Sequence, residues 1–172
     1  INNAGFGISG AIEFTPVEQA KRQLDVNFFG MVNMNHAALP VLRKQGFGRI
    51  VNLSSVAGAI PIPFQAFYSA SKAAINSYTM ALANEIKPFG VTVCCVQPGD
   101  IRTGFTDARQ KIAVGDDIYN GRISRSVAGM EKDERGGMAP EAAGAFICRV
   151  ATKKGVKPIN TIGLSYQFFC VL

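Results

Sequence analysis

Two short segments of the chain, residues 49–54 (RIVNLS) and 91–97 (VTVCCVQ), are dominated by β-branched and other hydrophobic side chains. Each follows a turn that contains glycine, and small or helix-breaking residues come after each one. Largely apolar runs of this length are typical of strands buried on both faces of a parallel sheet. A similar pattern predicts a last strand within residues 158–163 (PINTIG), and residues 1–5 (INNAG) have the pattern of the end of an earlier strand.

A helical pattern separates the first two of these strands. Thr15 is predicted to be its N-cap, with Pro16 in the first helical position and Glu18 completing a capping box. The helix is expected to continue to about Gln45, with Pro40 kinking or crowding its last turns.

Two further helices are predicted, over residues 66–87 before Pro88 and over residues 140–153. Residues 103–138 are polar and contain glycine, so we expect one or two short helices in a mobile excursion, where a lid would lie. Strands that alternate with helices predict right-handed crossovers and an α/β fold with a parallel sheet. Ligands of such sheets bind beyond the carboxyl ends of the strands.

Composition excludes several classes of function. The net charge of +6 is spread along the chain, so we expect no nucleic-acid partner. No hydrophobic run reaches the ~20 residues that a membrane-spanning helix needs. The single histidine, His36, lies among apolar residues of a predicted helix, so we expect a structural role for it and no metal site. No CxxC pair occurs, so buried free thiols and a reducing, cytoplasmic location are expected for the cysteines, which are Cys94, Cys95, Cys148 and Cys170.

A tyrosine and a lysine one helical turn apart, Tyr68 and Lys72, are the first candidates for chemistry. Residues at i and i+4 share a helix face, so the ammonium can lie near the phenol. A free phenol titrates near ~10, and a nearby positive charge lowers that pKa. We therefore expect Lys72 to lower the pKa of Tyr68, while the small residues beside the pair leave room for a flat cofactor.

Further polar residues occur in a specific order around this pair. Ser55 follows a predicted strand and precedes Tyr68 by 13 residues, and Asn27 lies inside the first predicted helix. The segment NNAG (residues 2–5) follows the first strand, and PGDIRT (residues 98–103) follows the third. This set resembles the short-chain dehydrogenase/reductase family from residue 2 to about residue 103, and more weakly to the end of the chain.

The resemblance implies an NAD(P)-dependent oxidoreductase that uses NAD or NADP as its cofactor. By this resemblance the catalytic residues are Asn27, Ser55, Tyr68 and Lys72. The residues expected to contact the dinucleotide are Asn3, Ala4, Gly5, Tyr68, Lys72, Pro98, Gly99, Ile101 and Thr103. Asn2 and Ser54 are expected instead to support the local structure.

Each expected role agrees with ordinary side-chain chemistry. Tyr68 would protonate a carbonyl oxygen during reduction and take the alcohol proton during oxidation. Ser55 would donate a hydrogen bond to the same oxygen as negative charge develops. Lys72 would also hold the nicotinamide ribose hydroxyls. Asn27, which is poorly suited to a helix interior, would hold a water that passes protons onward.

The resemblance also implies a doubly wound, Rossmann-type parallel sheet, of which residues 1–172 form a single incomplete domain. The family's phosphate-binding turn and the residue that separates NAD from NADP are absent. The segment GFGISG (residues 5–10) follows the equivalent of the fourth strand and is not that turn. We therefore expect the N-terminal strands to be missing and the C-terminal end to be cut. This piece alone is expected to be inactive and to bind dinucleotide poorly.

The predicted reaction interconverts an alcohol and a ketone or aldehyde by hydride transfer. A lipophilic substrate such as a steroid, retinoid or acyl chain is favoured by hydrophobic residues near the expected pocket, namely Phe105, Ile60, Ile62, Phe64 and Phe67. Two alternatives remain open: a 3-oxoacyl-carrier-protein reductase, and a dinucleotide-binding scaffold without turnover. An acyl hydrolase is disfavoured because the chain lacks a GxSxG elbow and a suitable histidine. The resemblance further implies a homodimer or homotetramer that pairs through residues 16–45 and 66–87.

Overall fold

The computed structural model describes residues 1–169. The strands are β1 Ile8–Ser9, β2 Gly48–Leu53, β3 Val91–Gln97, β4 Gln110–Lys111 and β5 Ile159–Thr161. A three-stranded parallel sheet has the order β2-β3-β5, and β1 pairs with β4 in a separate two-stranded parallel sheet. The α-helices are α1 Val17–Leu24, α2 Gly30–Gln45, α3 Ala66–Ile86, α4 Arg122–Arg135, α5 Pro140–Thr152 and α6 Leu164–Phe169. Shorter helical segments are η1 Ile12–Phe14, η2 Asp25–Phe29, η3 Val56–Gly58 and η4 Lys87–Phe89.

The three predicted strands of the main sheet are confirmed, and they pair in parallel as expected. Asn2 adds a single parallel bridge on the free side of β2. Its N–H donates to the Val51 carbonyl at 2.8 Å, and its carbonyl accepts from Leu53 N–H at 2.9 Å. The first residues therefore run alongside β2 and leave the sheet next to the carboxyl end of that strand.

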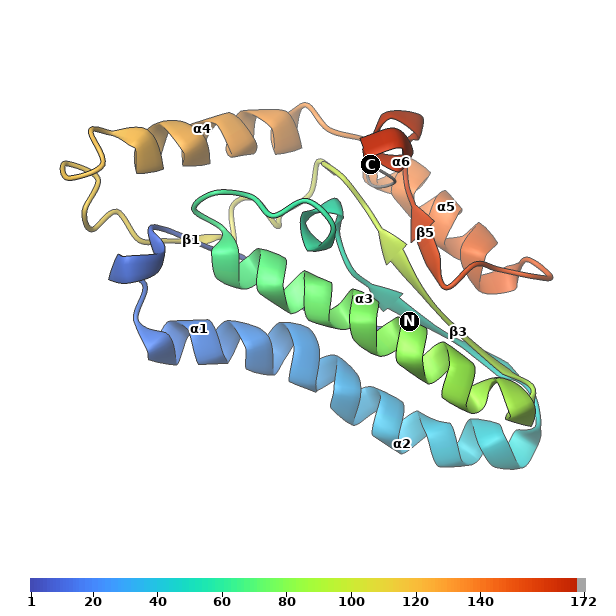
Figure 1. Cartoon of the computed structure of the whole chain (residues 1–172). Coiled ribbons are helices and arrows are strands. Elements are labelled where there is room, and N and C mark those ends of the chain that lie inside the picture. Colours follow the sequence, from blue (N-terminus) through green and yellow to red (C-terminus); the bar gives the residue numbers. More distant parts are fainter. Residues whose placement is uncertain (170–172) are drawn as a thin grey trace.

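Helices cover both faces of the sheet, which confirms the doubly wound α/β class (Figure 1). On one face, Leu53 and Val96 pack against α5 through Ala143 and Val150. The opposite face of the sheet packs against α3 and α2 through a second cluster, formed by Ile50, Val91, Val93, Leu82, Ile86, Leu39 and Leu42. The strands are apolar on both faces because both faces are covered, as the sequence pattern indicates.

The first predicted helix is present from residue 17 to residue 45, but it is not uniform. Five residues, Asp25–Phe29, form a π-helical turn between α1 and α2. The predicted N-cap is wrong: Pro16 takes that position, and Thr15 Oγ1 donates to the Ala11 carbonyl at 2.8 Å. The helical path continues through Pro40 to Gln45.

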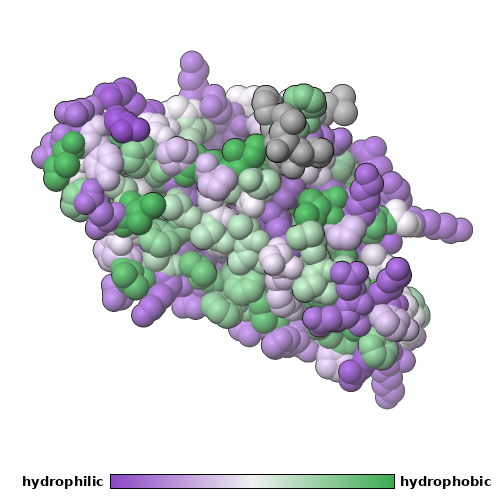
Figure 2. All heavy atoms as spheres, in the orientation of Figure 1, coloured by the Kyte–Doolittle hydropathy of each residue, from purple (hydrophilic) through white to green (hydrophobic). Residues whose placement is uncertain are grey.

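The second predicted helix is confirmed as α3, and its two sides differ. One side is buried against the sheet through Ile75, Leu82 and Ile86. The other side of the helix exposes small residues together with Met80, which has 43% of its surface exposed. Figure 2 shows hydrophobic side chains spread over the face on which Figure 1 draws α3.

Residues 103–138 are more ordered in secondary structure than the sequence predicts. They contain one helix of 14 residues, α4, together with the short strand β4. Ile123 and Val127 of α4 pack with Ala11, which fixes this excursion against the glycine-rich segment near the N-terminus. Ion pairs join Lys111 to Glu131 and Arg135 to Asp107 across the same excursion.

The cysteine prediction is correct in part. Cys94 and Cys95 are buried free thiols in β3, whereas Cys148 is a free but exposed thiol on α5. It is exposed because it lies on the side of α5 away from the sheet-facing Ala143 and Val150. Cys170 lies outside the described residues. Within residues 1–169, none of the helices is long and apolar enough to cross a lipid bilayer.

Candidate active site

A cavity of about 610 Å³ opens at the carboxyl ends of β2 and β3. Three of the four predicted catalytic residues line it: Ser55 just after β2, and Tyr68 and Lys72 on the first turns of α3. The loop that begins at Pro98 forms another part of the wall. The sheet therefore brings together residues that lie far apart in sequence, at the edge where ligands of parallel sheets bind.

Tyr68 is half-buried, and its ring lies 5.7 Å from the Phe105 ring, centroid to centroid. Burial raises the pKa of its phenol to about 12, although hydrogen bonding with Ser55 acts in the opposite direction. Charges on Glu134, Arg109 and Asp100 also affect this pKa. The expectation of a lowered pKa for Tyr68 is therefore wrong for this structure, because loss of water around the phenol outweighs the favourable contacts.

Lys72 is buried, with 6% of its surface exposed. Its Nζ atom lies 5.7 Å from the centroid of the Tyr68 ring and donates to the Leu53 carbonyl at 2.8 Å. Burial lowers the pKa of this ammonium to about 8. The lysine is thus held between the end of β2 and the cavity, which places its charge beside the phenol while one donor is fixed to the backbone.

Ser55 faces the cavity and Ser54 supports the local structure, which agrees with the positions expected for them from the sequence. Ser55 Oγ accepts from Ala57 N–H at 3.1 Å, donates to the Pro98 carbonyl at 3.5 Å and faces the cavity. Ser54 Oγ donates to the Lys72 backbone carbonyl at 3.0 Å, which ties β2 to α3. Of these two serines, Ser55 is the one whose side chain hydrogen-bonds with the phenol of Tyr68 and acts to lower its pKa.

Asn27 does not line the cavity. It lies in the π-helical turn with 1% of its surface exposed, and its side chain is hydrogen-bonded to the backbone of Phe6. Its Nδ2 donates to the Phe6 carbonyl at 3.0 Å and to Ser71 Oγ at 3.2 Å, while its Oδ1 accepts from Phe6 N–H at 3.0 Å. Both amide hydrogens have protein acceptors, so the side chain fixes the backbone of Phe6. The water-holding role expected for Asn27 from the sequence stays a prediction.

Eight of the nine residues that the resemblance implied as dinucleotide contacts line the cavity: Tyr68 and Lys72, together with Asn3, Gly5, Pro98, Gly99, Ile101 and Thr103. Ala4 is exposed and lies outside the lining. Asn2 has the structural role expected for it, because its Nδ2 donates to the side-chain oxygens of Asn35 and Asn52, each at 2.8 Å.

Gly5 lies where the cavity comes closest to the buried polar groups. A β-carbon at this position would lie 3.2 Å from Asn27 Oδ1 and 3.8 Å from Lys72 Nζ. Glycine therefore leaves a narrow space beside the ammonium that any larger side chain would fill. A flat ligand with hydroxyl groups could approach Lys72 through this space.

The hydrophobic wall differs from the sequence prediction. Ile62 and Phe105 line the cavity, but Ile60 is 43% exposed and Phe64 packs beside Ile123 and Val127 of α4. Phe67 is not part of the lining either. Residues of α4 and α5 that no local sequence signal identifies complete the cavity lining; they are the hydrophobic or small Met130, Pro140, Ala143, Gly144 and Ile147, and the charged Glu134.

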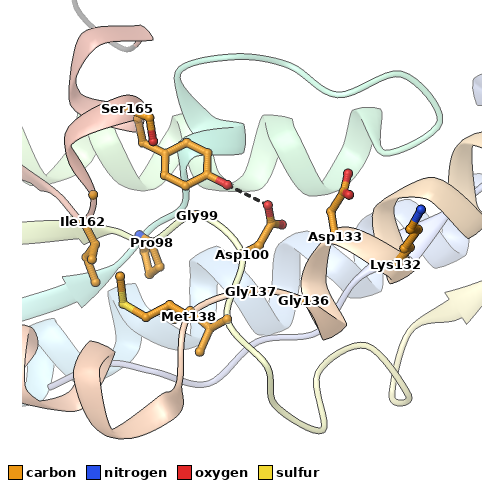
Figure 3. Close-up of a pocket in the computed structure, with 13 residues that line it drawn as sticks. Pro98, Gly99, Asp100, Lys132, Asp133, Gly136, Gly137, Met138, Ile162 and Ser165 are labelled. Atoms are coloured by element: carbon orange, nitrogen blue, oxygen red, sulfur yellow. Dashed lines mark hydrogen bonds between the residues drawn. The ribbon is translucent and has the colours of Figure 1, made fainter.

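A second cavity of about 810 Å³ lies on the other side of the loop after β3 (Figure 3). It shares Pro98, Gly99, Asp100 and Ile101 with the first cavity but contains neither Tyr68 nor Lys72. The dashed line in Figure 3 marks the hydrogen bond of 2.7 Å from the Tyr166 hydroxyl to Asp100. The loop is thus a wall between two cavities, and the candidate chemistry lies on one side of it.

His36 is exposed on α2 and does not line the cavity that contains Ser55 and Tyr68. A serine–histidine pair at this site is therefore ruled out by position. A hydrolase with a serine nucleophile and a histidine base needs the two side chains within hydrogen-bond distance of each other.

The doubly wound sheet, with a cavity lined by Ser55, Tyr68 and Lys72 at its carboxyl edge, defines an α/β protein with a candidate ligand site where such sheets bind their ligands. Residues 1–113 match the family model described as short chain dehydrogenase. The chain belongs to this short-chain dehydrogenase family.

Individual relatives support the same assignment. The chain is 47% identical over 156 residues to a 3-ketodihydrosphingosine reductase of Bacteroides thetaiotaomicron, which covers 90% of this chain and 58% of that protein. It is 43% identical over 105 residues to a probable short-chain type dehydrogenase/reductase of Helicobacter pylori, covering 61% of this chain and 39% of that protein. The chain therefore spans between about two fifths and three fifths of these relatives' own length.

A solved short-chain dehydrogenase from Streptomyces avermitilis superposes with a TM-score of 0.87 at 27% identity, over 99% of this chain and 62% of that one. This agreement over nearly the whole chain confirms the Rossmann-type class.

Proposed function

We propose that the protein is an NAD(P)-dependent oxidoreductase that interconverts an alcohol and a ketone or aldehyde. The observation that carries this proposal is the meeting of Ser55, Tyr68 and Lys72 at one cavity beyond the carboxyl ends of β2 and β3. Membership of the short-chain dehydrogenase family supports the same reaction class.

In this proposal Tyr68 is the general acid and base. During reduction its hydroxyl proton goes to the carbonyl oxygen of the substrate, and during oxidation the phenolate takes the proton back. The raised pKa of Tyr68, caused mainly by burial, keeps the phenol protonated at neutral pH. The residue is therefore ready to act as a proton donor in the direction of reduction.

Ser55 and Lys72 act on either side of the phenol. Ser55 donates a hydrogen bond to the substrate oxygen as negative charge develops there, and it also stabilises the phenolate. Lys72 places a positive charge within 5.7 Å of the Tyr68 ring. Asn27 acts indirectly, because it holds the Phe6 backbone that borders Gly5.

The dinucleotide, NAD or NADP, would be held by Asn3, Gly5, Pro98, Gly99, Ile101, Thr103 and Lys72, with Ala4 at the margin. The space left by Gly5 beside the Lys72 ammonium suits the ribose hydroxyls of a nicotinamide nucleoside. When bound, the nicotinamide supplies or accepts the hydride.

A lipophilic ketone or alcohol is the substrate class that we propose. Ile62, Phe105, Met130 and Ile147 give the cavity a hydrophobic wall next to Tyr68. The similarity to a protein named 3-ketodihydrosphingosine reductase makes a long-chain ketone the first substrate to test. An acyl-carrier substrate is the alternative, and it would require a basic docking surface around the cavity mouth.

The experiment is a comparison of Tyr68→Phe with Tyr78→Phe in the full-length protein. Both residues lie on α3, but Tyr78 packs against Phe28 away from the cavity, with ring centroids 5.8 Å apart. Tyr68→Phe is expected to lower kcat by about a hundredfold or more while dinucleotide binding, measured by titration calorimetry, is retained. Tyr78→Phe should leave both properties unchanged. Equal turnover in the two variants would show that Tyr68 is not the proton donor.

We further propose that the full-length protein forms a homodimer or homotetramer through α3 and the α1–α2 helix. Both surfaces expose hydrophobic side chains: Met80 of α3 is 43% exposed, and Phe29 and Met34 are 49% and 61% exposed. Large exposed hydrophobic residues that share a surface are typical of an interface between subunits.

A further inference from the structure

The excess positive charge of the chain lies at one end of the fold, where β2 and β3 start and where α2, α3 and α5 end. Seven of the 18 basic residues lie there, with Glu85 as the one of the 12 acidic residues beside them. The seven, which we call the basic edge, are Arg43, Lys44, Arg49, Lys87, Arg149, Lys153 and Lys154. The rest of the chain carries eleven bases and eleven acids, so this end holds the whole net charge of +6.

Contacts tie the separate segments of the basic edge together. Arg49 in β2 donates to the carbonyls of Val150 and Lys153, each at 2.7 Å, which fixes the end of α5 against the start of β2. On the other face of the sheet, the Arg43 guanidinium lies 5.8 Å from the centroid of the Phe89 ring and joins the end of α2 to the turn after α3. Figure 1 draws the ends of α2 and α3 beside the starts of β2 and β3 at the lower right. The fold thus gathers charge that is spread along the sequence.

The charges of the basic edge have no internal counter-ions. Six of the seven bases are exposed, and Arg49 is half-buried. None of them pairs with a carboxylate within residues 1–169, where the ion pairs join residues 107–135. Like charges that are gathered without counter-ions repel one another, which opposes folding. An anionic surface that binds this end would remove that repulsion.

Two large hydrophobic side chains lie among these charges. Phe47, just before β2, is 65% exposed, and Phe89, in the turn before β3, is 45% exposed. The two turns are neighbours, because Gly48 and Val91 are paired in the parallel register. The helix dipole favours basic residues in the last turn of a helix, which explains part of the charge. It does not explain two phenyl rings left in water beside that charge.

From these observations we infer that the basic edge docks on an anionic lipid bilayer. The bases pair with lipid phosphates, and Phe47 and Phe89 enter the boundary between the headgroups and the acyl chains. A bilayer offers negative charge over an apolar interior, which matches both features of this end. A single-stranded nucleic acid offers the same charge but usually lies in a groove. Both cavities described above lie at the opposite end of the strands.

This surface is separate from the candidate active site. Strand β3 has seven residues. At a rise of about 3.3 Å per residue, the basic edge and the candidate cavity lie roughly 20 Å apart. An acyl-carrier substrate would need basic residues at the cavity mouth, so the basic edge does not support that alternative. The inference is independent of the proposed function, and substitutions in the basic edge should leave turnover unchanged.

The test is sedimentation of the full-length protein with two kinds of vesicle: phosphatidylcholine alone, and an equal mixture of phosphatidylcholine and phosphatidylglycerol. At about 0.1 M salt the wild-type protein is expected to bind the mixed vesicles at least about tenfold more tightly. At about 1 M salt this preference should be lost, because charges are then screened within about 3 Å. Equal binding to both kinds of vesicle, or binding to neither, would overturn the inference.

The variant Lys44→Gln/Lys87→Gln removes two charges from the basic edge and should weaken binding to the mixed vesicles by about 10- to 30-fold. The matched control is Lys21→Gln/Lys132→Gln, which makes the same change at exposed lysines of α1 and α4. Its binding should stay within about threefold of wild type, since these charges lie away from the docked surface. An equal loss in the two variants would mean that total charge, and not this end of the fold, attracts the lipid.

The variant Phe47→Ser/Phe89→Ser tests the apolar part of the surface. It should bind the mixed vesicles about tenfold more weakly and keep the salt dependence. Its control is Ile12→Ser/Ile118→Ser, at two residues that are 63% and 66% exposed elsewhere in the fold, and it should bind like wild type. Thermal unfolding reports folding without any assay of activity, and the lysine variant decides the question if the phenylalanine variant is unfolded.

A folded Phe47→Ser/Phe89→Ser variant that binds like wild type would overturn the inference. A single-stranded oligonucleotide, added as a competitor, separates the two kinds of anionic partner. It is expected to displace the wild-type protein from the mixed vesicles only weakly. If the protein binds the oligonucleotide more tightly than the vesicles, the basic edge is a nucleic-acid surface and the inference is wrong.

Discussion

The Nζ atom of Lys72 lies 5.7 Å from the centroid of the Tyr68 ring but donates to the carbonyl of Leu53, 2.8 Å away. The backbone bond holds the ammonium beside the phenol, in a buried position that lowers the pKa of Lys72 to about 8. Burial of this charge opposes folding. The site thus keeps a cation where the proposed chemistry needs it, at a cost in stability that should be measurable.

The pH dependence of that cost has a definite sign. The pKa of Lys72 falls from 10.5 in the unfolded chain to about 8 in the folded one. The folded state therefore binds this proton less tightly, and the destabilisation is absent above pH 10.5, grows as pH falls toward 8 and is complete below 8. The shift corresponds to roughly 3 kcal/mol of unfavourable free energy at neutral pH.

We predict that Lys72→Met stabilises the full-length protein at pH 7 by about 1–2 kcal/mol, because loss of the bond to Leu53 offsets part of the gain. Near pH 10 the gain should largely disappear. Urea unfolding at the two pH values measures the difference, with Lys44→Met, at an exposed lysine of α2, as the control. A stabilisation of equal size at both pH values would contradict the assignment of the cost to a buried ammonium.

Gly58 is predicted to be essential for the position of Ser55. A β-carbon on Gly58 would lie 2.7 Å from the backbone carbon of Lys72 and 2.8 Å from its oxygen, so helix η3 could not stay packed against α3. Gly58→Ala should destabilise the protein by about 2–3 kcal/mol, as overpacking against backbone does. It should also lower kcat, because η3 carries Ser55 at its N-cap.

The matched control is the same substitution at Gly129, an exposed position inside α4 where a β-carbon would meet nothing within 4 Å. Gly129→Ala should raise stability by about 0.5–1 kcal/mol through helix propensity alone. Thermal unfolding of both variants distinguishes the two cases. If Gly58→Ala is as stable as Gly129→Ala, the close approach of η3 to α3 is not a real constraint.

The sequence predicted the parts of the fold that local pattern determines. Strands β2 and β3 and helix α3 were correct because burial on both faces, helical spacing and Pro88 act within each segment. The Thr15 cap was wrong because its hydroxyl bonds to the Ala11 carbonyl, a choice set by the preceding η1 turn. Strands β1 and β4 are two residues each and exist only through pairing between residues about a hundred positions apart, which no local signal records.

The candidate site, like the fold, could be predicted from the sequence only in part. Ser55, Tyr68 and Lys72 were identified by order and spacing, and the structure brings them to one cavity. Glu134 was missed because it reaches the cavity from an irregular excursion whose course depends on tertiary packing. The rise in the pKa of Tyr68 was not predicted either. The sequence spacing places Lys72 near the phenol, but it does not show how much water the phenol loses on burial.

Asn27 is predicted to affect stability and turnover through its hydrogen bonds to the backbone of Phe6. Asn27→Ala removes the acceptor of Phe6 N–H, whereas the Phe6 carbonyl keeps a second donor, Gln23 Nε2, at 3.0 Å. One buried donor left without a partner costs about 1–3 kcal/mol, and kcat should fall because Gly5 borders the cavity. Urea unfolding and steady-state kinetics measure the two effects.

Asn84→Ala is the control for Asn27→Ala, because Asn84 is exposed and its Nδ2 donates to the Met80 carbonyl one turn earlier in the same helix. Its effect on stability should stay within about 0.5 kcal/mol. If Asn27→Ala matches Asn84→Ala in both stability and kcat, the hydrogen bonds from Asn27 to the Phe6 backbone are dispensable.

The exposed face of α3 is predicted to be a subunit interface. Ala81 lies on this face next to Met80, and a carboxylate there would be buried without a partner if two copies met. Ala81→Glu should therefore convert the full-length protein to a smaller species in size-exclusion chromatography with light scattering. Ala128→Glu places the same change on an exposed residue of α4 and should leave the mass unchanged. A wild-type protein that elutes as a monomer, or an Ala81→Glu variant with the wild-type mass, would exclude pairing through this face.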